Sequence, residues 1–204
     1  MAGVDLDPEA VSYAHRERSE TTGFVLGDVT RLPFAGSTFD IVTTFETIEH
    51  VPDFVTCLQE FSRVLKEGGV LFCSTPNRAV SSPDGIIRNP YHVREFTVAE
   101  FRQALSEVFS DVRILGQWCR RNLAAPVLCR LIWRCLTLRG VRKLPFFFRE
   151  ELSRALTHAP LFPAWEEFDF LTNPTGAATL IGVCRKSGTQ THPALRRNLA
   201  AGGI

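Results

Sequence analysis

Apolar positions along the chain follow two patterns, short runs typical of buried strands and spacings of three and four typical of helices. The clearest run is FDIVTTF at Phe39–Phe45, where β-branched and aromatic residues predict a strand buried on both faces. Beyond it, apolar residues recur at spacings of four, three and four: Phe54, Leu58, Phe61 and Leu65. They predict a helix that begins at Pro52-Asp53, buries one face and ends at Gly68-Gly69.

Strands and helices continue to alternate outside this region. Asp7-Pro8-Glu9 has the residues of a helix start, and Thr97 with Glu100 predicts a capping box. Further strands are predicted at residues 24–26, 70–74, 112–115 and 178–184. This rhythm predicts an α/β fold with crossover connections, a mostly parallel sheet and helices on both faces.

The lengths between predicted elements indicate the domain organisation. Residues 1–116 form the predicted core, and residues 117–176 are too long for a plain connection and predict a helical insert or lid. Residues 177–186 contain the last core strand. Residues 187–204 lack an apolar pattern and predict a disordered tail.

Composition narrows the class of protein. The chain is 45% hydrophobic and 22% charged with a formal net charge of +1, which gives no reason to expect nucleic-acid binding. The six cysteines form no CxxC pair, so we interpret them as reduced thiols of a cytoplasmic protein. Arg130 and Arg134 interrupt the most apolar region, residues 123–138, which argues against a membrane span.

The predicted insert alternates basic and apolar residues. Its basic members are Arg120, Arg121, Arg130, Arg134, Arg139, Arg142 and Lys143. Such a helix can lie peripherally on an anionic membrane, or it can cover a substrate cleft as a lid whose arginines face water. We favour the lid.

Several short blocks resemble, in their order and spacing, the class I S-adenosylmethionine-dependent methyltransferases, particularly the methyltransferase type 11 group that includes ubiquinone-pathway O-methyltransferases. The blocks are Gly3-Val4-Asp5-Leu6-Asp7-Pro8-Glu9, Gly27-Asp28-Val29, the strand at Phe39, Leu65-Lys66-Glu67-Gly68-Gly69 and Thr75-Pro76-Asn77. The resemblance implies a Rossmann-like fold and methyl transfer from S-adenosylmethionine to a hydroxyl of a small molecule or saccharide. It does not indicate an oligomeric state.

The resemblance also implies which residues bind the cofactor. Asp5 matches the acid that accepts hydrogen bonds from both ribose hydroxyls, and Asp28 matches the acceptor of the adenine amino group, next to Val29. Leu6 matches an apolar adenine contact, and Glu46 lines the cofactor site. The alternative is that both aspartates are turn residues that close strands. We would favour it for either one alone, but the two together favour cofactor binding.

One family feature has no match in the chain. The family's first strand and its glycine-rich loop have no match, so the chain matches the family from its second strand onward. We therefore expect a truncated core. The alternative to an enzyme is a non-catalytic remnant that acts as an interaction domain.

Ionisable residues cluster after the strand at Phe39. Glu46, Glu49 and His50 form an E-x-x-E-H pattern that would share one face of a helical turn, and His92 follows later. Two carboxylates and two imidazoles suit Mg²⁺ or another divalent ion, in a pattern similar to the metal site of small-RNA 2′-O-methyltransferases. Without a metal, His50 or His92 is the candidate base for a substrate hydroxyl.

Overall fold

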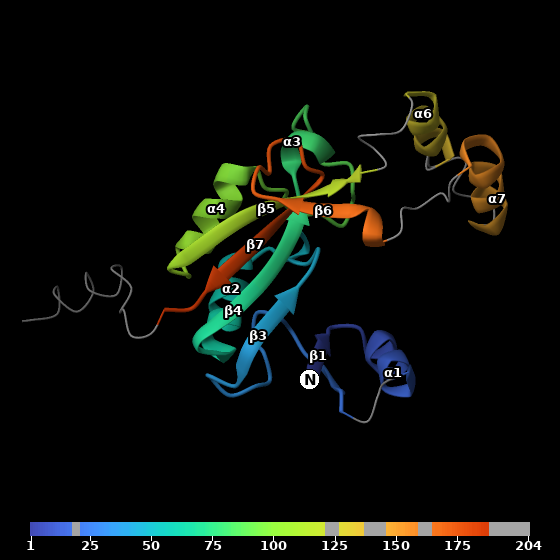
Figure 1. Ribbon diagram of the computed structural model, residues 1–204. Helices are drawn as coiled ribbons and strands as arrows, with labels where there is room; N and C mark the ends of the chain where they lie inside the picture. The colour runs from blue at the N-terminus through green and yellow to red at the C-terminus, as the bar shows by residue number, and fades with distance from the viewer. Residues whose placement is uncertain (18–20, 121–126, 137–145, 159–164, 188–204) are drawn as a thin grey trace, which may run out of the picture. The chain divides into compact units, whose positions relative to one another are not determined.

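The computed structural model describes residues 1–17, 21–120, 127–136, 146–158 and 165–187 (Figure 1). The chain divides into two compact units. The first comprises Met1–Gly116 with Thr172–Ile204, and the second comprises Gln117–Leu171. The residues proposed to carry chemistry from sequence all lie in the first unit.

A small parallel sheet begins the first unit. Strand β1 (Ala2–Asp5) pairs with β2 (Gly23–Leu26), so that Asp5 lies opposite Leu26, and helix α1 (Pro8–Glu17) connects them. Asp7 caps α1, since its Oδ1 accepts a hydrogen bond from the Glu9 N–H at 2.8 Å. The predicted helix start and the parallel crossover are both confirmed.

The larger sheet has five strands in the order β3-β4-β7-β5-β6. These are β3 (Phe39–Thr44), β4 (Leu65–Pro76), β7 (Thr179–Arg185), β5 (Asp111–Cys119) and β6 (Phe168–Leu171). Strand β4 runs parallel to β3 and antiparallel to β7. The predicted α/β fold is confirmed, with a central sheet that mixes parallel and antiparallel pairs.

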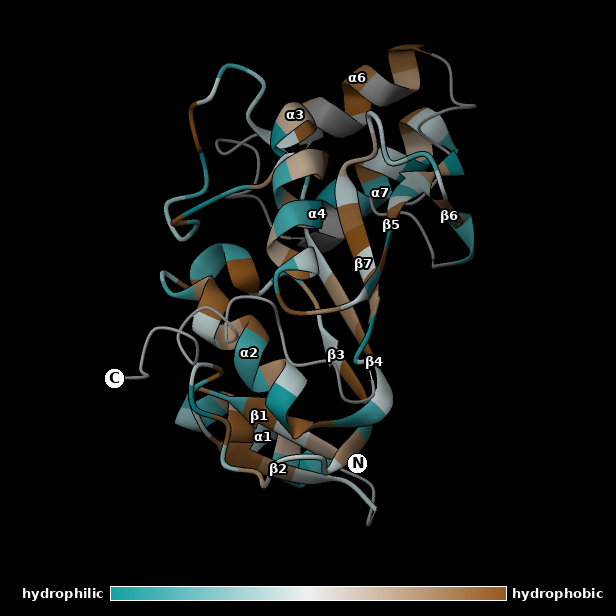
Figure 2. Ribbon diagram, turned by 90° about the vertical axis from the view of Figure 1, so that its left-hand side faces the viewer, coloured by the Kyte–Doolittle hydropathy of each residue, from teal (hydrophilic) through white to brown (hydrophobic). Residues whose placement is uncertain are grey.

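Two helices cover one face of this sheet (Figure 2). Helix α2 (Phe54–Val64) packs against β4, and α4 (Val98–Ser106) packs against β7. Thr97 and Glu100 form the predicted capping box at the start of α4. Fully buried side chains on the facing sides of the helices and strands form the core, among them Leu58, Phe101, Leu105, Leu71 and Leu180.

Two sequence predictions in this region were wrong. Helix α2 ends at Val64 and not at Gly68-Gly69, because Leu65 already pairs with Phe39 as the first residue of β4. Strand β3 is not buried on both faces. It pairs only with β4 among the described strands, and Ile41 is 58% exposed.

The second unit contains α6 (Val127–Leu136), α7 (Phe146–Thr157), a 3₁₀ turn at Trp165–Glu167 and β6. Helix α6 packs against α7. Of the basic residues in the predicted insert, Arg120 pairs with Asp169 at 3.5 Å, while Arg121, Arg139, Arg142 and Lys143 lie outside the described residues. The predicted disordered tail also falls outside them, apart from Ser187.

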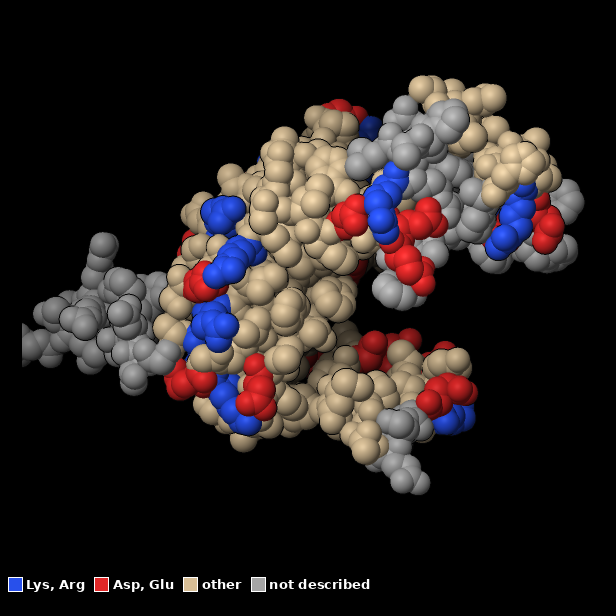
Figure 3. Space-filling model, in the orientation of Figure 1, with Lys and Arg blue, Asp and Glu red and all other residues tan. Residues whose placement is uncertain are grey.

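Charges of both signs are interspersed on the face seen in Figure 3. Lys66 pairs with Asp40 at 2.9 Å, and Lys186 lies 3.8 Å from Glu67. Among the described helices, none combines the length and the apolar character needed to cross a bilayer.

Candidate functional site

After β3 the backbone turns sharply at residues 46–50, and this segment forms the corner of the candidate site. Glu46 follows the strand with φ of 51°, a left-handed conformation that is uncommon outside glycine. Ser74 on β4 holds it there, accepting a hydrogen bond from the Glu46 N–H at 3.0 Å and donating one to Glu46 Oε1 at 2.8 Å. Desolvation raises the pKa of Glu46, and the Ser74 hydrogen bond opposes the rise.

A 3₁₀ turn at Ile48–His50 follows, so the helical turn predicted to begin at Glu46 begins later. The turn buries Glu49 completely. Thr75 Oγ1 donates to Glu49 Oε2 at 3.2 Å, whereas Oε1 has no hydrogen-bond partner. Burial raises the pKa of Glu49.

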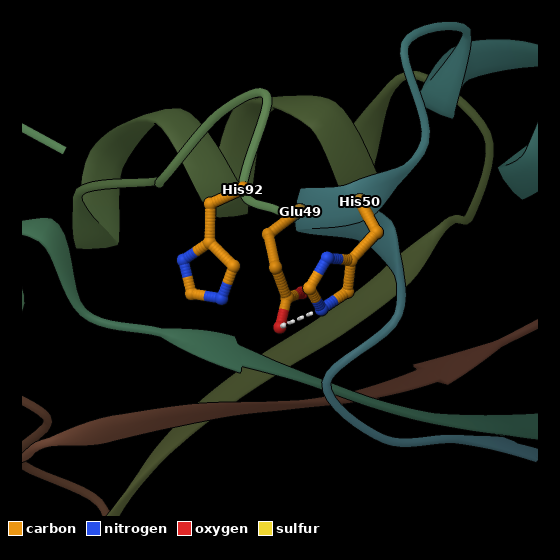
Figure 4. Close-up of side chains that lie close together, drawn as sticks. All are labelled: Glu49, His50 and His92. Carbon is orange, nitrogen blue, oxygen red and sulfur yellow. Dashed lines mark ion pairs between the residues drawn. The ribbon is translucent and has the colours of Figure 1, made fainter. Parts of the chain in front are cut away.

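The loop before α4 brings His92 to the same corner. The Glu49 backbone carbonyl accepts hydrogen bonds from the N–H groups of Val93 at 2.9 Å and Arg94 at 3.2 Å. The His50 and His92 rings meet edge to face with centroids 4.8 Å apart. Figure 4 shows the Glu49 carboxylate between the two imidazoles, with one His50 nitrogen turned toward it.

Each imidazole is held through its Nδ1. His50 Nδ1 lies 2.8 Å from the Tyr91 carbonyl, and His92 Nδ1 lies 2.9 Å from Glu95 Oε1. Burial acts to raise the pKa of Glu95, but hydrogen bonds from Ser81 and His92 outweigh it and leave the pKa lowered. Glu95 is therefore a carboxylate at neutral pH, and it accepts a hydrogen bond from the N–H at Nδ1 of His92.

The corner thus brings together three of the four residues proposed as metal ligands. One ligand atom from each of Glu49, His50 and His92 lies within 4.8 Å of the others. Glu46 is not part of this three-residue group and uses one carboxylate oxygen on Ser74. Its roles in metal and cofactor binding stay predictions.

The residues proposed to bind the cofactor lie at the ends of β1 and β2. Asp5 is the last residue of β1, and Asp28 follows β2 by two residues, so both are at the carboxyl ends of adjacent parallel strands. Both are exposed, as is Leu6, whereas Val29 packs partly against the core. These four assignments also stay predictions.

Each of these aspartates also closes a turn. Asp5 Oδ1 accepts from the Asp7 N–H at 2.9 Å, and Asp28 Oδ1 accepts from the Thr30 N–H and hydroxyl, both at 2.8 Å. The backbone hydrogen bond from Thr30 lowers the pKa of Asp28 most. The turns engage Oδ1 of each residue, which leaves Oδ2 to accept from a ligand.

Sequence reasoning missed the residues that hold the imidazoles: Glu95, Ser81, Tyr91 and Asn89. The three-residue spacing of His92 and Glu95 was a usable signal, because groups spaced in this way can meet across one turn. The contact with Tyr91 left no signal in the sequence, because it is made by a backbone carbonyl that every residue carries.

Adjacent parallel strands with acids at their carboxyl ends are a common arrangement in α/β proteins that bind nucleotide ligands. Residues 1–73 match the model of a methyltransferase domain family. A Thermotoga maritima S-adenosylmethionine-dependent methyltransferase superimposes with a TM-score of 0.59 at 14% identity, covering 91% of this chain and 72% of that one. The chain has the class I methyltransferase fold, and its residues 1–73 are similar to the methyltransferase domain family.

The relatives found by sequence are also described as methyltransferases. A Mycolicibacterium smegmatis protein described as a probable S-adenosylmethionine-dependent methyltransferase is 36% identical over 113 residues, or 55% of this chain and 44% of that protein. A Staphylococcus aureus demethylmenaquinone methyltransferase is 33% identical over 75 residues, or 36% of this chain and 31% of that enzyme. The chain therefore spans less than half the length of these curated relatives.

Proposed function

We propose that the chain is a cytoplasmic S-adenosylmethionine-dependent methyltransferase that methylates a hydroxyl of a small molecule or saccharide. The observation that carries the proposal is the pair of acids, Asp5 and Asp28, at the carboxyl ends of β1 and β2 in a methyltransferase fold. In parallel sheets, loops at the carboxyl ends of the strands are where nucleotide ligands bind.

The two aspartates fit a nucleoside. Asp5 Oδ2 can accept from ribose hydroxyls and Asp28 Oδ2 from an exocyclic amine, while Oδ1 of each keeps its turn closed. S-adenosylmethionine, when bound, supplies an electrophilic methyl group on a sulfonium. The chain's own contribution is to hold the reactants in line and to accept a proton.

The acceptor's hydroxyl proton has a receiver in the corner at the end of β3. His50 Nδ1 faces the Tyr91 carbonyl, which can only accept, so Nδ1 carries the proton and Nε2 has a free lone pair. His50 is exposed and can reach an acceptor. In the transfer, the cofactor's S–CH₃ bond would break as the new O–C bond formed, leaving a thioether, and the hydroxyl proton would move to the His50 imidazole.

Cofactor binding is tested by calorimetry with S-adenosylmethionine. Asp5→Asn and Asp28→Asn keep the Oδ1 that closes each turn but lose the charge and one acceptor oxygen. Because hydrogen bonds to charged groups contribute about 1.5–3 kcal/mol, each variant should bind at least about tenfold more weakly. Asp40→Asn, which alters an exposed acid of β3 paired with Lys66, should bind like the wild type.

Transfer of tritium from methyl-labelled cofactor to a panel of hydroxyl acceptors then tests the reaction, with demethylmenaquinone included as a different acceptor class. Labelled ether product supports the proposal, and labelling of demethylmenaquinone alone contradicts a hydroxyl acceptor. If the wild-type chain binds no cofactor, the alternative of a non-catalytic interaction domain replaces the enzyme. Membrane contact through the second unit stays a prediction.

A further inference from the structure

A buried carboxylate oxygen at the corner lacks a partner. Glu49 is 0% exposed, and its Oε1 accepts no hydrogen bond. His50 Nε2, at 4.0 Å, is too distant to donate one. Buried polar atoms are almost always paired, so an orphaned carboxylate oxygen indicates a missing positively charged or donor group.

The two imidazoles beside it have the tautomers that a metal ligand requires. The Tyr91 carbonyl fixes the proton of His50 on Nδ1, and the Glu95 carboxylate does the same for His92. Each Nε2 then carries a lone pair, and that of His92 faces the Asn89 amide nitrogen at 2.7 Å. Metal-binding histidines commonly donate their second N–H to a carbonyl or carboxylate in this way.

The partners of His92 are themselves held. Ser81 Oγ donates to Glu95 Oε2 at 2.5 Å, and Glu95 is 4% exposed. Asn89 Nδ2 lies 2.7 Å from His92 Nε2. The Tyr91 N–H also donates to Asn89 Oδ1 at 3.1 Å, so an ion that binds His92 Nε2 must displace the Asn89 Nδ2 contact.

We propose that Glu49 Oε1, His50 Nε2 and His92 Nε2 bind a divalent first-row transition-metal ion such as Zn²⁺. Two imidazoles and one carboxylate favour such ions over Mg²⁺ and Ca²⁺, which prefer all-oxygen ligands. The ligand atoms lie within 4.8 Å of one another. Bond lengths of about 2.0–2.2 Å place tetrahedral ligand atoms roughly 3.4 Å apart, so these three atoms must draw together when the ion binds.

This site deepens the proposed function, on which its catalytic use rests. With His50 39% exposed, the metal keeps open positions toward solvent where an acceptor hydroxyl can coordinate. Coordination would lower the pKa of that hydroxyl, and because the ion would then occupy His50 Nε2, the proton would pass to solvent at the open positions and not to His50. Metal binding itself does not require S-adenosylmethionine, so the two proposals fail separately.

Metal binding is tested on the full chain with Zn²⁺ by calorimetry and with Co²⁺ by visible absorption. We expect one ion per chain at the corner and at least about a hundredfold weaker binding of Mg²⁺. Glu49→Gln and His50→Ala should each weaken binding by at least about a hundredfold. Glu95→Gln, which only positions His92, should weaken it by about ten- to a hundredfold.

Two controls separate this site from other binding. His15→Ala removes an exposed histidine of α1 and should leave affinity unchanged. Cys135→Ser removes an exposed thiol and should remove thiolate charge-transfer absorption without removing the corner site. Melting temperatures without metal show that each variant folds. Equal Zn²⁺ affinity in wild type, Glu49→Gln and His50→Ala, or tighter binding of Mg²⁺ than Zn²⁺, would overturn the proposal.

Discussion

Neighbouring residues of β3 and β4 make very different contributions to stability. Leu71 of β4 is 0% exposed and belongs to the core, whereas Ile41 of β3 is 58% exposed. Both are apolar, β-compatible residues in adjacent strands, and the sequence alone predicts burial for both. The register separates them: Leu71 lies opposite Val42, which packs against the core, whereas Ile41 lies opposite Val70, so Leu71 and Ile41 point to opposite faces of the sheet.

Truncating these two residues tests the difference. Leu71→Ala should lower the free energy of unfolding by about 2–5 kcal/mol, because it leaves a cavity among fully buried side chains. Ile41→Ala should lower it by less than about 1 kcal/mol. Urea denaturation followed by circular dichroism measures both. Similar losses for the two variants would mean that a further element covers Ile41.

At the scale of elements, the loop before β3 is held against α2 by hydrogen bonds to Glu60 and Arg63, two α2 residues that form an ion pair with each other. Glu60 Oε2 accepts from the Leu32 N–H at 2.8 Å, and Arg63 donates to Glu60 Oε1 at 2.6 Å. Arg63 also donates to the carbonyls of Leu32 and Phe34. The Arg63 hydrogen bond lowers the pKa of Glu60 from its usual 4.5.

This fastening should depend on pH. A lowered folded-state pKa means that the Glu60 contribution is fully present above pH 4.5 and is lost as pH falls through the folded-state value. Glu60→Gln should therefore cost about 1–2 kcal/mol near neutral pH and progressively less as the pH falls to about 3. Denaturation at several pH values measures this, with the exposed Glu67→Gln as control. A cost that does not change with pH would contradict the pair's role.

Local signals predicted elements better than they predicted their limits. The spacing of Phe54, Leu58 and Phe61 and the capping box at Thr97 act within a few residues, and both features are confirmed. The predicted end of α2 was wrong because Leu65 belongs to β4, where it pairs with Phe39, a residue far away in sequence. Boundaries set by tertiary pairing leave little local trace in the sequence.

The candidate site shows the same division. Glu49, His50 and His92 could be selected from their chemistry, and the structure brings them together. The burial of Glu49, its unpartnered oxygen and the support of His92 by Glu95 depend on how the loop before α4 returns to the end of β3. The path of this loop could not be predicted from the sequence, because the hydrogen bonds that hold it are made by backbone groups.

On the scale of the whole molecule, the corner joins two segments far apart in the chain, and one carbonyl accepts two of the hydrogen bonds between them. Glu49 O accepts from both Val93 and Arg94, which connects the end of β3 to the loop that carries His92. Hydrogen exchange should therefore protect these two amides at least about tenfold more than the amide of Ile87, in the exposed part of the same loop. Equal exchange would show that the loop opens freely.

These two amides also offer a way to search for the acceptor. Whatever compound enters this corner must either leave the connection between its two walls intact or disturb it. In a nitrogen–proton NMR spectrum, a compound that disturbs these hydrogen bonds would shift the two amide peaks, and one that leaves them intact would not. Candidate molecules could then be ranked by the signals of Val93 and Arg94 before any product has been identified.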